Sequence, residues 1–145
     1  MNQEPAAFVY RIAKIERIVD GDTLDVVFDL GFDVLLRSRI RMFGIDTPES
    51  RTRDDVEKVF GLASKEYLKH RVSEAKTVVC KTHVADARGK FGRVLGEIWC
   101  DGVNINQAMV NKGYAVAYYG ENKDAVAAQH LENRQKLIES GAVKL

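Results

Sequence analysis

Short runs of β-branched and apolar residues, separated by turn-forming residues, dominate the first half of the chain and constrain its fold most strongly. Such runs are typical of the strands of a small all-β unit. Asp20-Gly21, the segment 29–33 around Gly31 and the basic segment 87–92 supply turns between them. Five strands are predicted, over residues 8–19, 24–28, 34–43, 76–84 and 94–100.

Helical periodicity occurs in three places, all after the third predicted strand. Apolar residues recur at helical spacing from Val56 to Val72. A short helix is predicted over 103–112, with Gly113 as its C-terminal cap, and a longer helix is predicted over 124–140. This order of elements predicts an α+β domain, in which a five-stranded Greek-key β-barrel of the OB-fold type carries three α-helices.

Length and composition agree with one domain over residues 1–145. The chain has 145 residues and is 46% hydrophobic, which is enough for a single core. Its 22 Lys and Arg residues against 21 Asp and Glu give a net charge of +1, so any attraction of a polyanion must be local. Cys80 and Cys100 match neither a disulfide framework nor a zinc spacing, and they are expected to be buried thiols.

The N-terminal residues lack the basic start and the apolar run of a signal peptide, and they include Glu4 and Pro5. No segment of the sequence reaches membrane-spanning length. We therefore expect a soluble, cytoplasmic protein with no membrane association. A monomer is the expected state, because no feature demands more, and a bacterial, phage or plasmid source stays open.

Two acidic segments are candidates for metal binding. In Asp20-Gly21-Asp22-Thr23, two carboxylates flank a glycine at a strand end, where they can present oxygen atoms to a hard cation. In Asp46-Thr47-Pro48-Glu49, Asp46 can supply another carboxylate to the same cation, and the proline turn can direct Glu49 toward a substrate. The alternatives are a plain Asp-Gly turn and a helix start at Thr47-Pro48.

Two basic segments are candidates for phosphate binding. Arg37, Arg39 and Arg41 alternate along the third predicted strand and share one of its faces, and Arg41 leads into the second acidic segment. In Arg88-Gly89-Lys90-Phe91-Gly92-Arg93, glycines that allow close backbone approach alternate with basic groups and an aromatic that can meet phosphate and base. The alternatives are a solvated sheet face and a plain surface turn.

The combination of these segments favours chemistry over the alternatives. Hydrolysis of a phosphodiester places extra negative charge on the phosphate oxygens in the transition state, and arginines with a cation stabilise this charge from different sides. A carboxylate can activate or orient the attacking water. The set of Asp22, Asp46, Glu49, Arg41 and Arg93 therefore predicts a metal-dependent nuclease.

With these residues identified, the chain resembles the staphylococcal (micrococcal) nuclease family, a group of calcium-dependent nucleases on an OB-fold barrel with three helices. The resemblance extends from Val9 to Leu137. It rests on five segments in the same order: Val19-Asp20-Gly21-Asp22-Thr23, Arg41 through Glu49, Val56-Glu57-Lys58 with Ala63-Ser64, Lys90-Phe91-Gly92-Arg93, and Gln129-His130-Leu131.

The resemblance implies a Ca²⁺ cofactor, bound by Asp22, Asp46 and the backbone carbonyl of Thr47, with waters completing the shell. It implies that Arg41 and Arg93 bind the scissile phosphate. It also implies that the glutamate of the second acidic segment occupies the general-base position. In this family water attacks phosphorus and the 5′ oxygen leaves, so DNA, RNA or both are expected to yield 3′-phosphate ends.

Substrate contacts are implied for Lys90 and for Tyr118 and Tyr119, of which one is expected to stack on a base. Phe91 stands where the type member of the family has tyrosine, so a phenolic hydrogen bond to phosphate is lost at this position.

The main alternative is a non-catalytic OB-fold module that binds nucleic acid or a protein partner, as degenerate members of the family do. Such modules lose catalytic positions, whereas the complete set is present here. His70, His83 and His130 are widely separated and match no ligand pattern, so they are expected to be structural.

Overall fold

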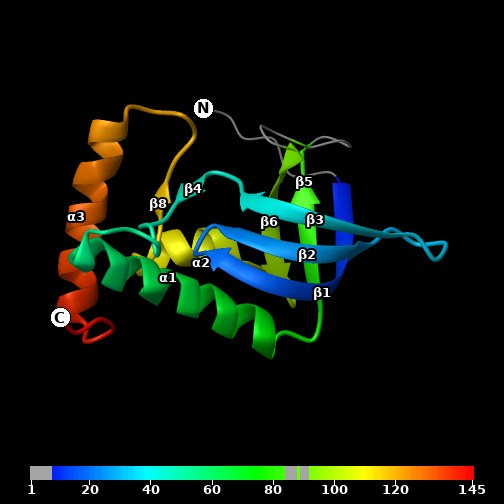
Figure 1. Cartoon of the computed structure of the whole chain (residues 1–145), viewed down its shortest axis with the longest axis horizontal. Helices are drawn as coiled ribbons and strands as arrows, with labels where there is room; N and C mark the ends of the chain where they lie inside the picture. Colours follow the sequence, from blue (N-terminus) through cyan, green and yellow to red (C-terminus); the bar gives the residue numbers. More distant parts are fainter. Residues whose placement is uncertain (1–7, 84–87, 89–91) are drawn as a thin grey trace.

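The computed structural model describes residues 8–83, 88 and 92–145 of the chain (Figure 1). The regular elements follow in this order: β1 (Phe8–Asp20), β2 (Thr23–Asp29), β3 (Leu35–Met42), β4 (Ile45–Asp46), α1 (Asp55–Glu74), β5 (Val78–Thr82), β6 (Val94–Cys100), β7 (Val103–Asn104), α2 (Ile105–Lys112), β8 (Val116–Ala117) and α3 (Lys123–Glu139).

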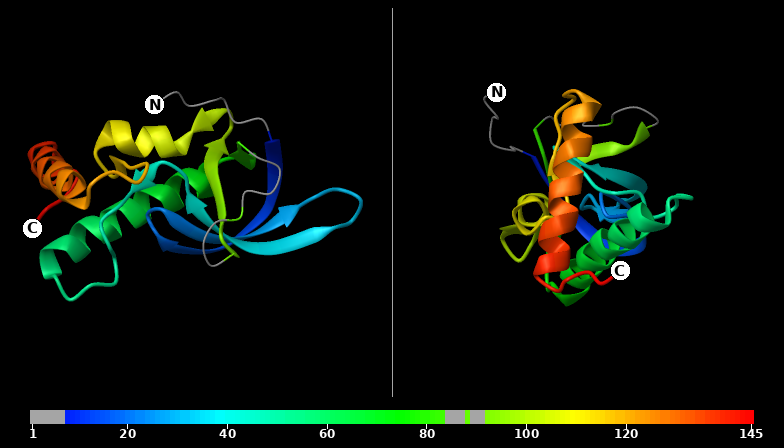
Figure 2. Two further views of the ribbon diagram at one scale, coloured as in Figure 1. Left: turned by 90° about the horizontal axis from the view of Figure 1, so that it is seen from above. Right: turned by 90° about the vertical axis from the view of Figure 1, so that its left-hand side faces the viewer.

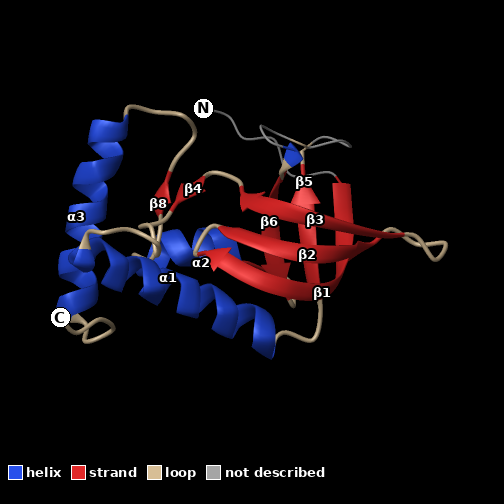
Figure 3. Ribbon diagram, in the orientation of Figure 1, coloured by secondary structure: helices blue, strands red, loops and turns tan. Residues whose placement is uncertain are grey.

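Five strands close into a barrel, as predicted. β1 pairs with β2 and β5, β2 with β3, and β5 with β6, all in antiparallel fashion. A parallel pairing of β3 with β6, which joins Ile40 to Val94 and Met42 to Gly96, connects the two ends of this sheet. The α+β architecture of a five-stranded OB-fold barrel with three helices is therefore confirmed (Figure 3).

The first strand serves two neighbours because it is long and irregular. Its residues Phe8 to Arg11 pair with β5, and residues from Arg11 onward pair with β2. Register shifts interrupt the pairing with β2 at three points, after Ile12, Ile15 and Ile18. Such irregularities bend a strand and increase its twist, as a small closed barrel requires.

The core fills the barrel and continues into α1 and α2. Fully buried side chains from strands and helices form one cluster, which includes Leu24, Val26, Ile40, Leu68, Ile98, Ile105 and Met109. A smaller cluster of Phe60, Leu137 and Val143 holds α3 against α1. As a result α3 covers one end of the molecule, opposite the projecting β2–β3 hairpin (Figure 2).

The cysteines lie in the main core cluster. Cys80 and Cys100 are both free and buried, which confirms the prediction of buried thiols. Burial, with a smaller contribution from the charge of Glu97, raises the pKa of Cys80 to about 12.

The helices begin and end at well-defined caps. The Asp54 side chain accepts hydrogen bonds from the backbone N–H groups of Val56 and Glu57, so α1 starts there and the alternative helix start at Thr47-Pro48 is wrong. Gly113 ends α2 with a φ of 86°, as its predicted role of C-cap requires. Among the described residues, no helix combines the length and the hydropathy that a membrane span requires.

Three strands of two residues each, β4, β7 and β8, were not predicted. β4 pairs with β8, so that Ile45 faces Ala117 and Asp46 faces Val116. A two-residue strand is too short for an alternating pattern to reveal it. The pairing nevertheless decides the position of Asp46.

Candidate active site

Asp22, Arg41 and Asp46 come together from three separate segments. Asp22 lies in the turn between β1 and β2, Arg41 near the end of β3, and Asp46 in β4. Arg41 Nη1 lies 3.3 Å from Asp22 Oδ2, and Arg41 Nη2 lies 3.7 Å from Asp46 Oδ1. One guanidinium group therefore bridges the two carboxylates that the sequence predicts as metal ligands.

The Asp22 carboxylate is held rigidly. The residue is 8% exposed, and its oxygens accept hydrogen bonds from Thr23 Oγ1 at 2.9 Å and from the Thr47 backbone N–H at 3.2 Å. A Cβ at the preceding residue, Gly21, would lie 2.7 Å from Ser64 Cβ of α1. The turn that carries Asp22 is therefore packed directly against α1, and only glycine permits this contact.

Asp46 is surrounded by cationic and hydrogen-bonding groups. His130 Nε2, from α3, lies 2.8 Å from Asp46 Oδ2, and Lys123 Nζ lies 4.0 Å from Asp46 Oδ1. Burial alone would raise the pKa of Asp46, but the hydrogen bond and charge of His130, with the charges of Lys123 and Arg41, outweigh it and lower the pKa. Asp46 is therefore ionised over a wide pH range.

The loop that carries Glu49 is fixed through its backbone, while the residue itself is exposed. The Glu49 N–H donates to Glu57 Oε2 at 3.0 Å, and both the N–H and the hydroxyl of Ser50 donate to Asp20 Oδ1. A Cβ at Gly61 of α1 would overlap the Glu49 carbonyl group. Asp20, one of the two acidic residues in the first candidate segment, thus positions the loop.

Arg93 lies directly before β6, the strand that pairs in parallel with the end of β3. Because Val94 pairs with Ile40, the backbone of Arg93 lies beside the part of β3 that carries Arg41. Lys90, which is predicted to contact the substrate, lies outside the described residues.

Tyr118 and Tyr119 follow β8 and border the segment that leads to Asp46. The Tyr118 N–H donates to the carbonyl of Gly44 at 2.8 Å, and its ring centroid lies 4.4 Å from Lys123 Nζ. The Tyr119 ring packs edge-on against Phe43 at 5.6 Å and is 48% exposed. Tyr118 therefore shares a neighbour, Lys123, with Asp46, and Tyr119 packs against the segment that precedes Asp46.

The oxygen atoms at this site suit a hard cation. No metal-binding cluster of three or more His, Cys, Asp or Glu side chains occurs in the described part of the chain, so a cation here has only two carboxylates. The backbone carbonyl of Thr47 is a further oxygen donor, and the buried Thr47 Oγ1 has no hydrogen-bond partner among the described residues. Ca²⁺ takes about six to eight oxygen ligands and accepts water among them, so the donor set fits Ca²⁺ but predicts weak binding.

Several residues near the site carried little signal in the sequence. His130 was expected to be structural, yet it contacts Asp46, and only its place in the Gln129-His130-Leu131 segment pointed to the site. Lys123 carried no functional signal, and Glu57 stood out only through its place in the Val56-Glu57-Lys58 segment, because their contacts depend on how α1 and α3 pack.

The chain is similar to a family and to several named proteins. The sequence profile of the staphylococcal nuclease homologue family matches residues 39–140. An uncharacterized endonuclease of Escherichia coli is 35% identical over 114 residues, which cover 78% of this chain and 65% of that protein. Endonuclease YhcR of Bacillus subtilis (strain 168) is 32% identical over 111 residues, which cover 72% of this chain and 9% of that protein.

Protein ParB of Escherichia coli is 31% identical over 114 residues, which cover 72% of this chain and 56% of that protein. The chain spans less than two thirds of the length of each of these three relatives. The profile match nevertheless extends over most of the chain and includes Arg41, Asp46, Glu49 and Arg93. The chain therefore belongs to the staphylococcal nuclease family.

Proposed function

We propose that the chain is a Ca²⁺-dependent nuclease that hydrolyses phosphodiester bonds of DNA, RNA or both. The observation that carries this proposal is the contact of Arg41 with both Asp22 and Asp46, next to the exposed Glu49. Family membership and the relatives named as endonucleases support it.

In this proposal Asp22, Asp46 and the Thr47 carbonyl hold the cation. When bound, the cation supplies positive charge that stabilises the extra negative charge on phosphate in the transition state. Arg41 is already oriented by its contacts with both carboxylates and by a 3.0 Å hydrogen bond to the carbonyl of Met42. A preoriented guanidinium costs little to reorganise when charge develops on the substrate.

The remaining roles in this proposal are those that the family resemblance implies. Arg41 and Arg93 bind the non-bridging oxygens of the scissile phosphate, and Glu49 accepts a proton from the attacking water or orients it. Water attacks phosphorus in line with the 5′ oxygen, which leaves with its nucleoside, and a 3′-phosphate end remains. Tyr118, Tyr119 and Lys90 contact the substrate beyond the reacting phosphate.

The second candidate function is a non-catalytic module that binds nucleic acid or protein. The buried Asp22 argues against it. Burying a carboxylate on a side chain that is only 11% exposed costs free energy, and a scaffold gains no stability from a second carboxylate on the other side of Arg41.

The test is cleavage of single-stranded and duplex DNA and RNA by the purified chain, with Ca²⁺ or with chelator. We expect cleavage with Ca²⁺, none with chelator, and 3′-phosphate ends on the products. Arg41→Ala, Glu49→Ala and Arg93→Ala should each lower kcat by about 10²-fold or more, because each removes a group that acts in the transition state.

Arg37→Ala is the matched control. It removes an arginine from the same strand, but this side chain is 78% exposed and pairs with Glu16 at 2.9 Å. We expect it to retain wild-type activity. Intact nucleic acid after incubation of the wild type with Ca²⁺ would contradict the proposed function, and wild-type rates in all three site variants would contradict the assignment of residues.

A further inference from the structure

A pocket of about 290 Å³ opens between α3 and the loop that carries Glu49. Asp46, Thr47 and Glu49 form part of its lining, so it is continuous with the candidate active site. Pockets that bind small molecules begin at about this size.

The two walls of the pocket differ in charge. Lys123, His130 and Arg134 follow one another at helical spacing along α3 and form a basic wall. The opposite wall carries Asp46, Glu49 and Glu57, which belong to β4, to the loop after it and to α1. A ligand with negative charge would therefore bind against α3.

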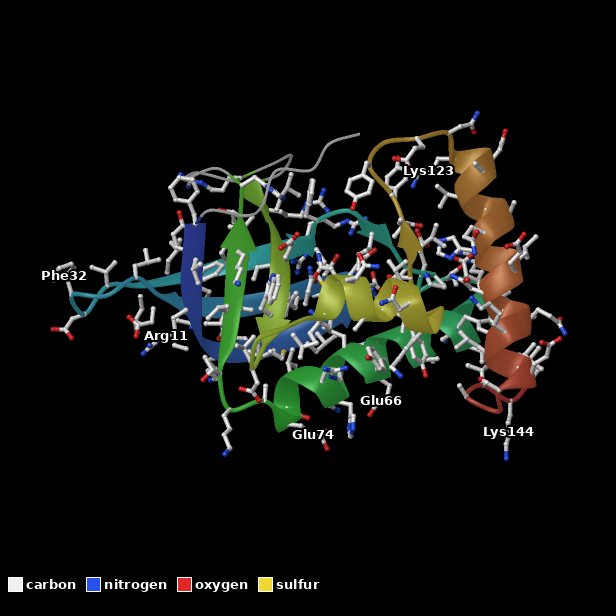
Figure 4. The ribbon with its side chains drawn as sticks, turned by 180° about the vertical axis from the view of Figure 1, so that it is seen from behind. Arg11, Phe32, Glu66, Glu74, Lys123 and Lys144 are labelled. Carbon is white, nitrogen blue, oxygen red and sulfur yellow. The ribbon has the colours of Figure 1, made fainter. Side chains whose placement is uncertain are left out.

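Arg134 and Lys123 both line the pocket, and Lys123 Nζ lies at the 4.0 Å limit of an ion pair with Asp46 Oδ1. The Arg134 guanidinium lies 5.4 Å from the Phe60 ring centroid, and its buried Nε has no hydrogen-bond partner among the described residues. Lys123 is in the first turn of α3, where the helix dipole also favours an anion, and its side chain is 68% exposed. Figure 4 shows Lys123 at this end of the helix, next to the segment that follows β8.

The stereochemistry of the proposed reaction decides which part of a nucleic acid reaches this pocket. The attacking water and the leaving 5′ oxygen lie on opposite sides of phosphorus. If Glu49 acts on the water, the leaving nucleotide points away from Glu49. The pocket, which contains Glu49, is then open only to the strand on the 5′ side of the cleaved bond.

We propose that this pocket is a second phosphate site, in which Lys123 and Arg134 bind the phosphodiester one nucleotide to the 5′ side of the bond that is cleaved. The inference rests on the proposed function. It makes α3 part of the substrate-binding surface and gives the enzyme a preference for cleavage away from the 5′ end of a strand.

Trinucleotides test this proposal, because cleavage at the second phosphodiester places the first in the pocket. One substrate is natural, and in the other an uncharged methylphosphonate replaces the first phosphodiester. The measured quantity is kcat/KM for release of the 3′-terminal nucleoside. Both substrates are deoxyribonucleotides or both are ribonucleotides, whichever kind the wild type cleaves faster. Loss of the charge should lower wild-type kcat/KM by about tenfold, as expected for one charged hydrogen bond.

Arg134→Gln and Lys123→Gln each remove a partner of the phosphodiester charge. In these variants the methylphosphonate substrate should therefore have a kcat/KM less than about threefold below that of the natural substrate. Each ratio compares two substrates on one preparation, so a loss of folded protein cancels. Lys136→Gln is the matched control, since Lys136 is on the same helix but lines a different groove with Gln129 and Asn133, and it should keep the full wild-type ratio.

Each result has a distinct meaning. A wild type that cleaves both trinucleotides equally well, or variants that keep the tenfold ratio, would overturn the second phosphate site while leaving the nuclease proposal intact. A wild type that cleaves neither trinucleotide nor longer DNA or RNA would overturn both proposals.

Discussion

The contact between His130 and Asp46 joins two residues that are far apart in the sequence and only 2.8 Å apart in space. Both are largely buried, with 15% and 22% of their side chains exposed. A hydrogen bond to an ionised, buried carboxylate is stronger than one between neutral groups. The contact therefore contributes to the stability of the fold as well as to the position of Asp46.

His130→Ala should lower the free energy of unfolding by roughly 1.5–3 kcal/mol at pH 7. The loss should depend on pH, because the pKa of Asp46 is lowered in the folded protein. A lowered carboxyl pKa contributes stability above the unfolded pKa, and this contribution disappears as the pH falls through the folded pKa. Urea denaturation of wild type and variant should therefore show a difference at pH 7 that shrinks below about pH 4.

His70→Ala is the control for this experiment. His70 Nε2 lies 3.3 Å from Glu74 Oε2, but both side chains are more than half exposed. Its substitution should change the free energy of unfolding by less than about 0.5 kcal/mol. Equal losses for both histidine variants, or a loss in His130→Ala that does not change with pH, would contradict the role of the Asp46 contact.

Residues of the site were predictable where chemistry is concentrated in a short segment. Asp22, Asp46 and Glu49 lie in acidic turns, and Arg41 leads into one of them, so the combination of these segments indicated a common site. His130 and Lys123 were not predictable in this way, because an isolated histidine or lysine on a helix is usually in contact with solvent. Their roles depend on the packing of α3 against the rest of the molecule.

At the scale of elements, α1 lies directly against the loop that carries Glu49 at Gly61. A Cβ at this position would overlap the carbonyl group of Glu49 and crowd the N–H of Ser50. Helix propensity alone favours alanine over glycine by about 1 kcal/mol. The close backbone contact outweighs this preference.

Gly61→Ala should therefore lower the free energy of unfolding by roughly 1–3 kcal/mol, as overpacking does, in spite of its higher helix propensity. It should also lower kcat by up to about 10²-fold, because a small displacement of Glu49 disturbs the reacting geometry. Thermal denaturation and the cleavage assay measure the two effects. Leu62→Ala, at a 45% exposed position of the same helix, should change kcat little, and an active, stabilised Gly61→Ala would refute the contact.

The long elements were predictable because each presents several periods of a hydrophobic pattern. β6 was predicted with the bounds that the structure has, and α1 and α3 were predicted to within two residues. β4 and β8 were not predicted, since each has only two residues and forms a strand only by pairing with the other. Local sequence cannot reveal such a strand pair, even though this pairing positions Asp46.

For the whole molecule, the parallel pairing of β3 with β6 makes the barrel and the site depend on one another. The pairing joins the strand that carries Arg41 to the strand that Arg93 precedes, across more than fifty residues of chain. Loss of barrel closure would separate the two arginines. We therefore expect activity and global folding to be lost together.

Thiol reactivity measures this closure directly, because Cys80 and Cys100 lie in the barrel core. Burial raises the pKa of Cys80 from 9.0 to about 12, which lowers the reactive thiolate fraction at pH 8 about a thousandfold. An aromatic disulfide reagent should modify neither thiol rapidly in the native protein, and both within minutes in concentrated guanidinium chloride. Rapid native modification would show that the barrel opens locally, without global unfolding.

The contacts of His130 and Lys123, both in α3, with Asp46 also have a consequence for the synthesis of the protein. A ribosome produces Asp22, Arg41 and Asp46 well before His130, since synthesis runs from the N-terminus. Until α3 has left the ribosomal tunnel, Asp46 lacks its histidine and Lys123, and the basic wall beside the loop that carries Glu49 does not exist. A chain assembled in this order acquires the contacts of His130 and Lys123 with Asp46 only after its own messenger RNA has been translated past that helix.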